Sequence, residues 1–159
     1  MNNKKIKKIS SLAKEIARLR KNGKKIVFTN GCFDIMHYGH ASYLAEAKKL
    51  GDILVVGVNS DRSVKRLKGP QRPVCDERSR SGLLAALESV DYVVIFGEDT
   101  PLETIKKIKP DFLVKGGDWK QGNIVGSREI AAYGGKTVRA GFQKGYSTTK
   151  IIEKIAKLK

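Results

Sequence analysis

The amino-acid sequence predicts a doubly wound α/β domain with a five-stranded parallel sheet and one extra helix at the N-terminus. Five short apolar runs alternate along the chain with segments in which apolar residues recur at helical spacing. Within the runs, apolar residues follow one another without polar alternation, which is typical of strands buried on both faces. A parallel sheet covered by helices on both sides accounts for both observations.

In the N-terminal half, the predicted elements are a helix at 6–21, a strand at 25–30, a helix at 38–50 and a strand at 53–58. The apolar residues of the first helix form a single stripe, and Asn22-Gly23 supplies a stop signal. The second helix ends at Gly51. We expect the stretch Arg62–Arg72, which follows the second strand, to be a long and mobile loop.

In the C-terminal half, the predicted elements are a helix at 76–88, a strand at 92–96, a helix at 100–108, a strand at 112–114, a helix at 126–133, a strand at 136–138 and a last helix after Ser147. Leu83, Leu84 and Leu87 are expected to face inward from the first of these helices. Pro101 suits the first position of a helix, and Ser147 is a favourable N-cap. Strands and helices thus alternate throughout, which favours parallel pairing of the strands.

The charge of the chain is strongly positive but unevenly distributed. The chain has 159 residues, whose length and 40% hydrophobic content suit one domain, and its formal net charge is +16. Residues 1–25 carry ten basic side chains against one acidic side chain, and residues 150–159 carry four against one. The remainder, 26–149, carries 18 basic and 14 acidic side chains. Most of the excess therefore lies at the two ends, and a nucleic-acid-binding protein that uses these ends stays an alternative.

Membrane and secreted proteins are disfavoured. No apolar stretch approaches the roughly 20 residues that span a bilayer, and the Lys-rich N-terminus lacks the apolar core of a secretory signal. The two cysteines, Cys32 and Cys75, make no disulfide framework, so we expect a cytoplasmic protein without a membrane partner. Neither cysteine is expected to be catalytic.

Three familiar site motifs are absent or misplaced. Asn30-Gly31-Cys32 after the first strand does not begin the Gly-x-Gly-x-x-Gly loop of dinucleotide-binding domains. Gly135-Lys136-Thr137 is similar to the end of a Walker A loop, but Ile130 stands where that loop requires its first glycine. The histidines and cysteines lack the spacing of a structural zinc site, so we expect no metal held by the protein alone.

Ligands of open α/β sheets bind beyond the carboxyl ends of the strands, and the only two histidines lie there. His37 and His40 follow the first strand and bracket Gly39 at a helix start. Backbone N–H groups and the helix dipole favour an anion at such a position, and glycine lets a phosphate approach closely. Two imidazoles can donate further hydrogen bonds, so this segment predicts a phosphate site without a nucleophile.

Two motifs resemble those of a known superfamily. Gly31-x-Phe33-Asp34-x-x-His37-x-Gly39-His40 resembles the signature of the cytidylyltransferase-like nucleotidyltransferases, and Ser147-Thr148-Thr149-Lys150 resembles their second signature, which opens the last helix. The resemblance covers about residues 25–156 and implies a Rossmann-like fold of the nucleotidyltransferase type. We therefore expect a basic N-terminal helix at 1–24 and a nucleotidyltransferase domain at 25–159.

Within this superfamily, several stretches resemble the D-glycero-β-D-manno-heptose 1-phosphate adenylyltransferases. These stretches are residues 90–93, 98–101, 109–111, 114–119, 124–126 and 134–135. In many bacteria that domain is the C-terminal half of a bifunctional heptose enzyme whose other half is a sugar kinase. The related glycerol-3-phosphate cytidylyltransferases carry an arginine where this chain has Phe142, which favours the heptose family.

The resemblance implies transfer of AMP from ATP, bound with Mg²⁺, to heptose 1-phosphate, giving ADP-heptose and pyrophosphate for lipopolysaccharide or a related glycan. A sugar 1-phosphate oxygen would attack the α-phosphorus in line, so the protein would contribute mainly positioning and charge stabilisation. A glycerol-3-phosphate cytidylyltransferase or an FMN adenylyltransferase stays an alternative. The resemblance also implies a homo-oligomer, a dimer or higher, that binds no nucleic acid.

The resemblance and the loop positions together assign roles to particular residues. The predicted catalytic residues are His37, His40, Lys68 and Arg80. The predicted nucleotide-binding residues are Thr29, Asn30, Gly31, Phe33, Gly39, Lys115, Gly117, Asp118, Trp119, Ser147, Thr148 and Thr149. The predicted sugar-phosphate-binding residues are Asp34, Asn59 and Arg72. Asp34 is expected to bind a sugar hydroxyl or a magnesium-bound water, with helix capping as the alternative. Trp119 is expected to shape the base pocket or to belong to the core.

Overall fold

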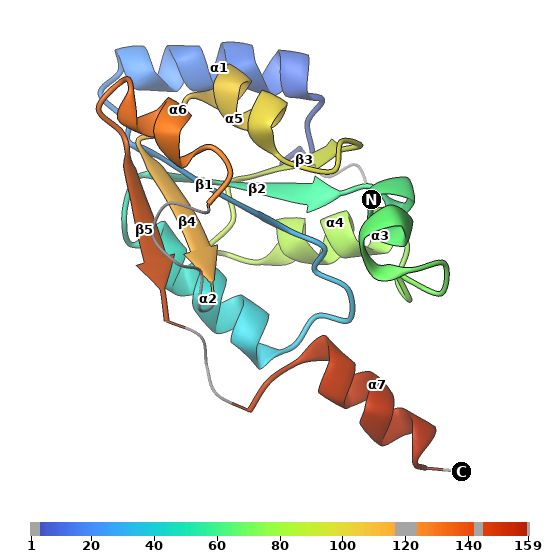
Figure 1. Ribbon diagram of the computed structural model, residues 1–159. Coiled ribbons are helices and arrows are strands. Elements are labelled where there is room, and N and C mark those ends of the chain that lie inside the picture. Colours follow the sequence, from blue (N-terminus) through green and yellow to red (C-terminus); the bar gives the residue numbers. More distant parts are fainter. Residues whose placement is uncertain (1–3, 117–123, 142–144, 159) are drawn as a thin grey trace.

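The computed structural model describes residues 4–116, 124–141 and 145–158 and contains one sheet of five parallel strands (Figure 1). The strands are β1 (Ile26–Gly31), β2 (Ile53–Asn59), β3 (Tyr92–Phe96), β4 (Phe112–Gly116) and β5 (Lys136–Ala140). Their spatial order is β3-β2-β1-β4-β5, and every neighbouring pair is parallel. The prediction of a doubly wound five-stranded sheet is therefore confirmed.

Helices cover both faces of the sheet. They are α1 (Ile9–Lys21), α2 (Tyr38–Lys48), α3 (Asp61–Lys68), α4 (Glu77–Ala86), α5 (Leu102–Ile108), α6 (Ser127–Ala131) and α7 (Thr148–Ala156). Figure 1 shows α1, α5 and α6 on one face and α2 and α4 on the other. α7 lies apart from the sheet, and none of its residues is buried. Across the described ranges, the helices are too short or too polar to traverse a membrane.

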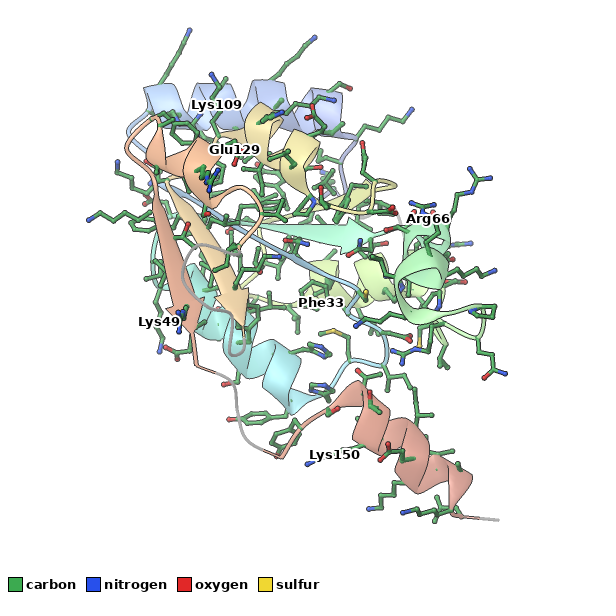
Figure 2. All side chains as sticks on the ribbon, viewed as in Figure 1. Phe33, Lys49, Arg66, Lys109, Glu129 and Lys150 are labelled. Atoms are coloured by element: carbon green, nitrogen blue, oxygen red, sulfur yellow. The ribbon has the colours of Figure 1, made fainter. Side chains whose placement is uncertain are left out.

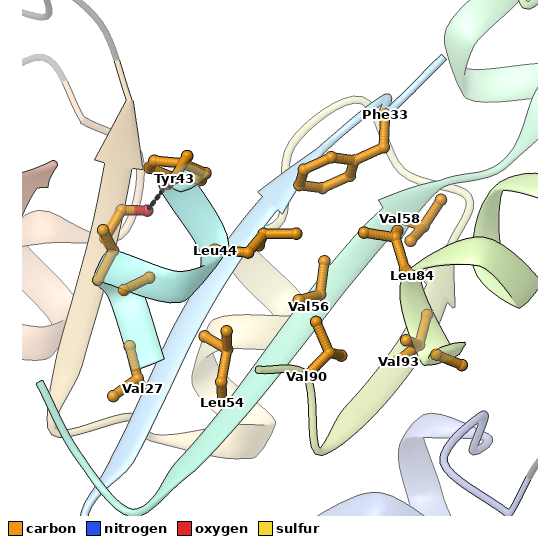
Figure 3. Close-up of a cluster of buried hydrophobic side chains, with 13 residues drawn as sticks. Val27, Phe33, Tyr43, Leu44, Leu54, Val56, Val58, Leu84, Val90 and Val93 are labelled. Carbon is orange, nitrogen blue, oxygen red and sulfur yellow. Dashed lines mark hydrogen bonds between the residues drawn. The ribbon is translucent and has the colours of Figure 1, made fainter. Parts of the chain in front are cut away.

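Two apolar cores fill the spaces between the sheet and the helices. On the side of α2 and α4, Leu44, Val56 and Leu84 are inaccessible to solvent (Figure 3). On the other side, Leu12 and Ile16 of α1 belong to a buried cluster that includes Phe28 and Ile105. Full burial of one such side chain contributes about 1.5–3 kcal/mol. The basic N-terminal helix therefore covers the sheet with its apolar stripe and turns its charges to solvent.

The helix α3 corrects the prediction of a long loop at 62–72. Its N-cap is Ser60, whose side chain accepts a hydrogen bond from the Ser63 N–H at 3.2 Å. Asp61 lies in its first turn and three basic residues lie in its last turn, so the charges complement the helix dipole. Val64 is its buried apolar anchor. Sequence periodicity missed this helix because its apolar stripe is so short.

Four smaller predictions also need correction. Helix α1 begins at Ile9 rather than at residue 6, because Ile6 forms a parallel bridge with Val93 of the edge strand β3. Leu83, which was predicted to face inward, is half exposed, whereas its neighbour Leu84 is fully buried in the core. Pro101 is the N-cap of α5 and not its first residue. Ser147 occupies the N-cap position of α7, but its side chain makes no capping hydrogen bond.

The sheet opens between β1 and β4. The registered pairs of these two strands are Val27 with Phe112 and Phe28 with Leu113, both near the amino ends. β1 then continues to Gly31 and β4 to Gly116. Successive connections leave this point toward opposite edges of the sheet, and such a switch point is where open α/β sheets bind ligands. The fold therefore places its binding crevice between the carboxyl ends of β1 and β4.

Candidate active site

A cavity of about 450 Å³ lies at the carboxyl ends of the strands, and we call it the main cavity. Fourteen of the predicted site residues line it: Asn30, Gly31, Phe33, Asp34, His37, Gly39, His40, Asn59, Lys68, Arg72, Lys115, Ser147, Thr148 and Thr149. Cys32, Tyr43 and Gly116 line it as well. Two segments far apart in sequence, the β1–α2 loop and the start of α7, therefore meet at one cavity. Gly117, Asp118 and Trp119 lie outside the described residues.

The two histidines form a stacked pair at the start of α2. His37 is the N-cap of this helix, and the ring centroids of His37 and His40 are 3.8 Å apart at an interplanar angle of 17°. Phe33 packs edge-on against His40 with its ring centroid 5.5 Å away; Figure 2 shows Phe33 in the loop that leads to α2. The sequence motif thus folds into two imidazoles that lie side by side along the cavity wall.

Burial disfavours the charged form of both imidazoles. Burial lowers the pKa of His40 to about 4, with a smaller contribution from the charge of His37, and burial also lowers the pKa of His37. The Nδ1 atoms of both rings are buried and find no hydrogen-bond partner among the described residues. A neutral imidazole carries one N–H. Each ring can therefore donate one hydrogen bond to a phosphate oxygen without first bearing a charge.

Tyr146 is a neighbour of the histidines that the sequence did not reveal. Its ring centroid lies 6.2 Å from that of His37 and 5.4 Å from that of Tyr38. A Cβ atom placed on Gly39 would lie 3.0 Å from the Cβ atom of Tyr146 and 3.2 Å from the His37 ring. The small size of Gly39 is therefore needed for the segment before α7 to pack onto the start of α2.

Asp34 anchors the loops around the cavity. Its carboxylate is almost inaccessible and accepts hydrogen bonds from Arg72 Nε at 2.7 Å, the Cys75 N–H at 2.9 Å and the Val74 N–H at 3.0 Å. Burial alone would raise the pKa of Asp34, but these hydrogen bonds and the Arg72 charge hold the pKa below its usual value. The backbone oxygen of Asp34 also accepts from Thr148 Oγ1 at 3.1 Å. Asp34 therefore anchors the loops around the main cavity, and its contact with a sugar hydroxyl or a magnesium-bound water stays a prediction.

Arg80, which was predicted to be a catalytic residue, does not line the main cavity. It is fully buried, and its guanidinium donates to Cys75 O at 2.9 Å, Cys32 O at 2.5 Å and Asp61 Oδ1 at 2.7 Å. These partners belong to the segment before α4, the β1–α2 loop and the first turn of α3. Arg80 thus joins three segments that surround the main cavity.

Thr29 is likewise a core residue and does not line the cavity. Its side chain is fully buried, and its Oγ1 lies 2.6 Å from the Tyr43 hydroxyl. The Tyr43 hydroxyl in turn donates a hydrogen bond to Val114 O at 3.1 Å, which Figure 3 marks with a dashed line. Burial raises the pKa of Tyr43 to about 12, so the hydroxyl keeps its proton. Thr29 and Tyr43 therefore connect β1, α2 and β4 beneath the site.

Lys115 extends across the opening between β4 and β1. Its Nζ donates a hydrogen bond to Asn30 Oδ1, and burial lowers the pKa of this lysine to about 8. No carboxylate among the described residues forms an ion pair with it. Lys68, at the end of α3, is an exposed second cation on the wall of the main cavity. These two lysines and Arg72 make the cavity suitable for anions.

A second cavity of about 250 Å³ adjoins the main one. Asn30, Asn59 and Lys115 line both cavities, and Leu67, Asp99, Thr100, Pro101, Ile124 and Val125 complete the second. None of the residues that complete the second cavity was predicted as a site residue; they come from α3, the β3–α5 connection and the segment before α6. No group of three or more His, Cys, Asp or Glu residues within the described ranges could hold a metal ion.

Comparisons with known proteins agree on one family. Residues 28–154 match the model of the family described as cytidylyltransferase-like. Bifunctional protein HldE of Helicobacter pylori is 58% identical over 148 residues, which are 93% of this chain and 31% of that protein. Bifunctional protein HldE of Campylobacter jejuni is 56% identical over 149 residues, which are 94% of this chain and 32% of that protein. The chain thus spans about a third of the length of these curated relatives.

Solved structures support the same fold. A lipopolysaccharide core biosynthesis protein from Thermoplasma volcanium is 37% identical and has a TM-score of 0.63, with 79% of this chain and 100% of that chain covered. A pantoate-beta-alanine ligase from Francisella tularensis is 16% identical and has a TM-score of 0.56, with 91% of this chain and 76% of that chain covered. The second likeness concerns the fold alone.

Proposed function

The chain belongs to the cytidylyltransferase-like family of nucleotidyltransferases, and we propose that it transfers AMP from ATP to D-glycero-β-D-manno-heptose 1-phosphate. The products would be ADP-heptose and pyrophosphate, for lipopolysaccharide or a related glycan. Relatives named as a bifunctional protein support this substrate choice, because heptose 1-phosphate adenylyltransferases are often half of a bifunctional enzyme. The relative named as a lipopolysaccharide core biosynthesis protein supports it as well.

The observation that carries the proposal is the meeting of two helix starts at one cavity. His37 and His40 stand at the start of α2, and Ser147, Thr148 and Thr149 stand at the start of α7. Helix starts present free backbone N–H groups and a favourable dipole to anions. The imidazoles of His37 and His40 add hydrogen-bond donors at the start of α2, and the hydroxyl groups of the α7 residues add donors at the start of α7. A triphosphate can therefore be held between the two helices, with its α-phosphate near the histidines.

The proposed reaction forms one P–O bond and breaks another. An oxygen of the sugar 1-phosphate attacks the α-phosphorus of ATP, and the bond from that phosphorus to the bridging oxygen of pyrophosphate breaks. His37 and His40 donate hydrogen bonds to the α-phosphate oxygens as charge develops there, and Lys68 stabilises the leaving pyrophosphate. The protein supplies no nucleophile and needs no covalent intermediate.

Magnesium enters this proposal only with ATP. The carboxylate of Asp34 is occupied by three donors, and the described residues offer no cluster of metal ligands. A magnesium ion commonly keeps several waters and binds through substrate phosphates. We also propose, from the family resemblance alone, a cytoplasmic homo-oligomer, for which light scattering of the purified protein is the test.

A substrate panel tests the proposed function. The purified chain is incubated with ATP and heptose 1-phosphate, and pyrophosphate release is followed with a coupled assay. The expected result is turnover with this pair and a much lower rate with CTP and glycerol 3-phosphate. Turnover only with CTP and glycerol 3-phosphate, or only with ATP and FMN, would replace the heptose assignment. Tight, steeply salt-dependent binding of duplex DNA without any turnover would favour the nucleic-acid alternative.

A further inference from the structure

We propose that Lys115 is a site of modification by small acyl phosphates, which transfer their acyl group to its side-chain amine and thereby inactivate the chain. This reaction differs from the proposed function, because the protein itself is the acceptor of the transferred group. The loss of activity rests on the proposed function, whereas the modification does not.

Lys115 lies where a small solute can reach it. It is the one lysine among the described residues that lines both cavities, and the cavities have volumes of about 450 Å³ and about 250 Å³. Its side chain is half-buried and extends from the end of β4 to Asn30 at the end of β1. A molecule much smaller than ATP that enters either space can therefore approach the Nζ atom.

The surroundings of Nζ leave a nucleophilic lone pair available. Nζ donates a hydrogen bond to Asn30 Oδ1, and no carboxylate among the described residues forms an ion pair with it. By contrast, Lys48 and Lys106 pair with carboxylates at 2.5 Å and 2.9 Å, and such a partner favours the ammonium form, which has no lone pair. An amide oxygen only accepts, so Asn30 engages an N–H of the amine and not its lone pair.

Desolvation supports the same conclusion about the protonation state. Burial lowers the pKa of Lys115 to about 8. Roughly a quarter of its side chains are then amines near pH 7.5, against about one in a thousand for a lysine with the usual pKa of about 10.4. Because a desolvated lysine amine is an activated nucleophile, Lys115 is primed to attack an electrophilic carbon.

The phosphate donors of the main cavity select the class of electrophile. The Nδ1 atoms of His37 and His40 are buried and lack a partner among the described residues, and Lys68 and Arg72 add positive charge to the same wall. The starts of α2 and α7 present backbone N–H groups there as well. An acyl phosphate combines a phosphate for these donors with a carbonyl carbon one oxygen atom away. Aldehydes and thioesters do not join their reactive carbon to a phosphate in this way.

The transfer forms one bond and breaks another. The lone pair of Nζ attacks the carbonyl carbon, and a C–N bond forms while the bond from that carbon to the phosphate oxygen breaks. The electron pair of the broken bond leaves with inorganic phosphate, and one amine proton passes to solvent. The product is an uncharged amide, and the reaction requires no oxidant or reductant.

Acylation of Lys115 would remove a cation and fill space at the meeting point of the two cavities. The amide carries no positive charge, so the main cavity loses part of its attraction for anions. The added acyl group also occupies volume that a bound triphosphate or its acceptor would use. Each modified molecule is therefore expected to be inactive.

Acetyl phosphate and mass spectrometry test the proposal. The purified chain is incubated with acetyl phosphate at several pH values, and acetylation of individual lysines is quantified over time. Lys68, an exposed lysine on the wall of the main cavity, and Lys107, an exposed lysine of α5, are the internal controls. Parallel samples contain inorganic pyrophosphate as a competitor for the phosphate donors. Turnover of ATP with heptose 1-phosphate is measured at each time point.

The expected result is selective acetylation of Lys115. Near pH 7.5 its rate should exceed those of Lys68 and Lys107 at least about tenfold, because its larger amine fraction outweighs the lower nucleophilicity of a less basic amine. The rate at Lys115 should level off above about pH 8, where the side chain is mostly amine. Pyrophosphate should slow Lys115 alone, and turnover should fall in proportion to its acetylated fraction.

The contrary outcomes are distinct. Equal acetylation rates at the three lysines, or a rate at Lys115 that pyrophosphate leaves unchanged, would overturn the proposed modification. Selective acetylation of Lys115 with full turnover would overturn the proposed inactivation. Selective acetylation in a chain whose unmodified form turns over no sugar 1-phosphate would overturn the proposed function and leave the modification site standing.

Discussion

Replacing Lys115 with methionine should make the folded protein more stable, although it removes a cation from the wall of the main cavity. Burial lowers the pKa of this lysine from its usual 10.5 to about 8. At about 1.36 kcal/mol per unit, this shift means that the folded state carries a penalty of roughly 3 kcal/mol for the charged side chain at neutral pH. Methionine is an unbranched side chain only one heavy atom shorter than lysine, and it removes the charge. The variant also loses the hydrogen bond to Asn30, which offsets about 1 kcal/mol of this gain in the free energy of unfolding.

The sign of the pH dependence distinguishes this account from a general packing effect. Between about pH 8 and pH 10.5 the unfolded chain keeps a proton on residue 115 that the folded chain has lost, so the stability contribution of Lys115 rises with pH. The advantage of Lys115→Met should therefore be largest at pH 7 and should shrink by about 2 kcal/mol at pH 9.5. Urea unfolding followed by circular dichroism measures both values, with Lys107→Met as the exposed control. If the stability advantage of Lys115→Met over the native chain stayed constant or grew with pH, the Lys115 ammonium would not be desolvated in the folded chain.

Four further variants test the site and its support. His37→Ala and His40→Ala should each lower kcat roughly 10²–10³-fold with an unchanged circular dichroism spectrum, because each removes a donor to the α-phosphate; near-native turnover in both would refute the phosphate site. Arg80→Ala should lower the free energy of unfolding by at least about 2 kcal/mol in urea titrations, since three oxygen acceptors lose their buried donor. The folded-state pKa of Asp34 is lowered, so its stabilising contribution is complete above its unfolded pKa and is lost as pH falls through the folded value. Asp34→Asn should therefore be less stable than the native chain at pH 7, and this gap should close on acidification; a gap that is the same at pH 7 and pH 3 would contradict the anchoring role.

Local patterns in the sequence predicted the sheet well because burial on both faces leaves continuous apolar runs, such as Ile53–Val58. They predicted α3 wrongly because that helix depends on the Ser60 cap and on charges at both ends, with Val64 as its buried anchor. Within the site, the motif located the loop but not the direction of each side chain. Thr29 and Asn30 are adjacent on β1, yet successive strand residues point to opposite faces, so one is buried in the core and the other lines both cavities.

The second cavity and the position of Tyr146 depend on contacts between distant segments, which local patterns do not encode. Tyr146 contacts His37 although the two residues are far apart in the sequence. Leu67 and Val125 are also far apart in the sequence, yet they line the same cavity. Pairs of this kind follow from the topology and register of the folded sheet, so the structure was needed to find them.

Two buried charged residues link the loops on which the histidines depend. Arg80 holds the β1–α2 loop to α3 through Cys32 O and Asp61, and Asp34 holds the same loop to the segment before α4 and to Thr148 at the start of α7. Buried ion pairs add little net stability but are costly to break, since the remaining partner is left desolvated. Their effect here is geometric: a shift in either pair would move the start of α2 relative to the start of α7. Because in-line transfer is sensitive to displacements of about 1 Å, neither residue needs to touch a substrate to be essential for turnover.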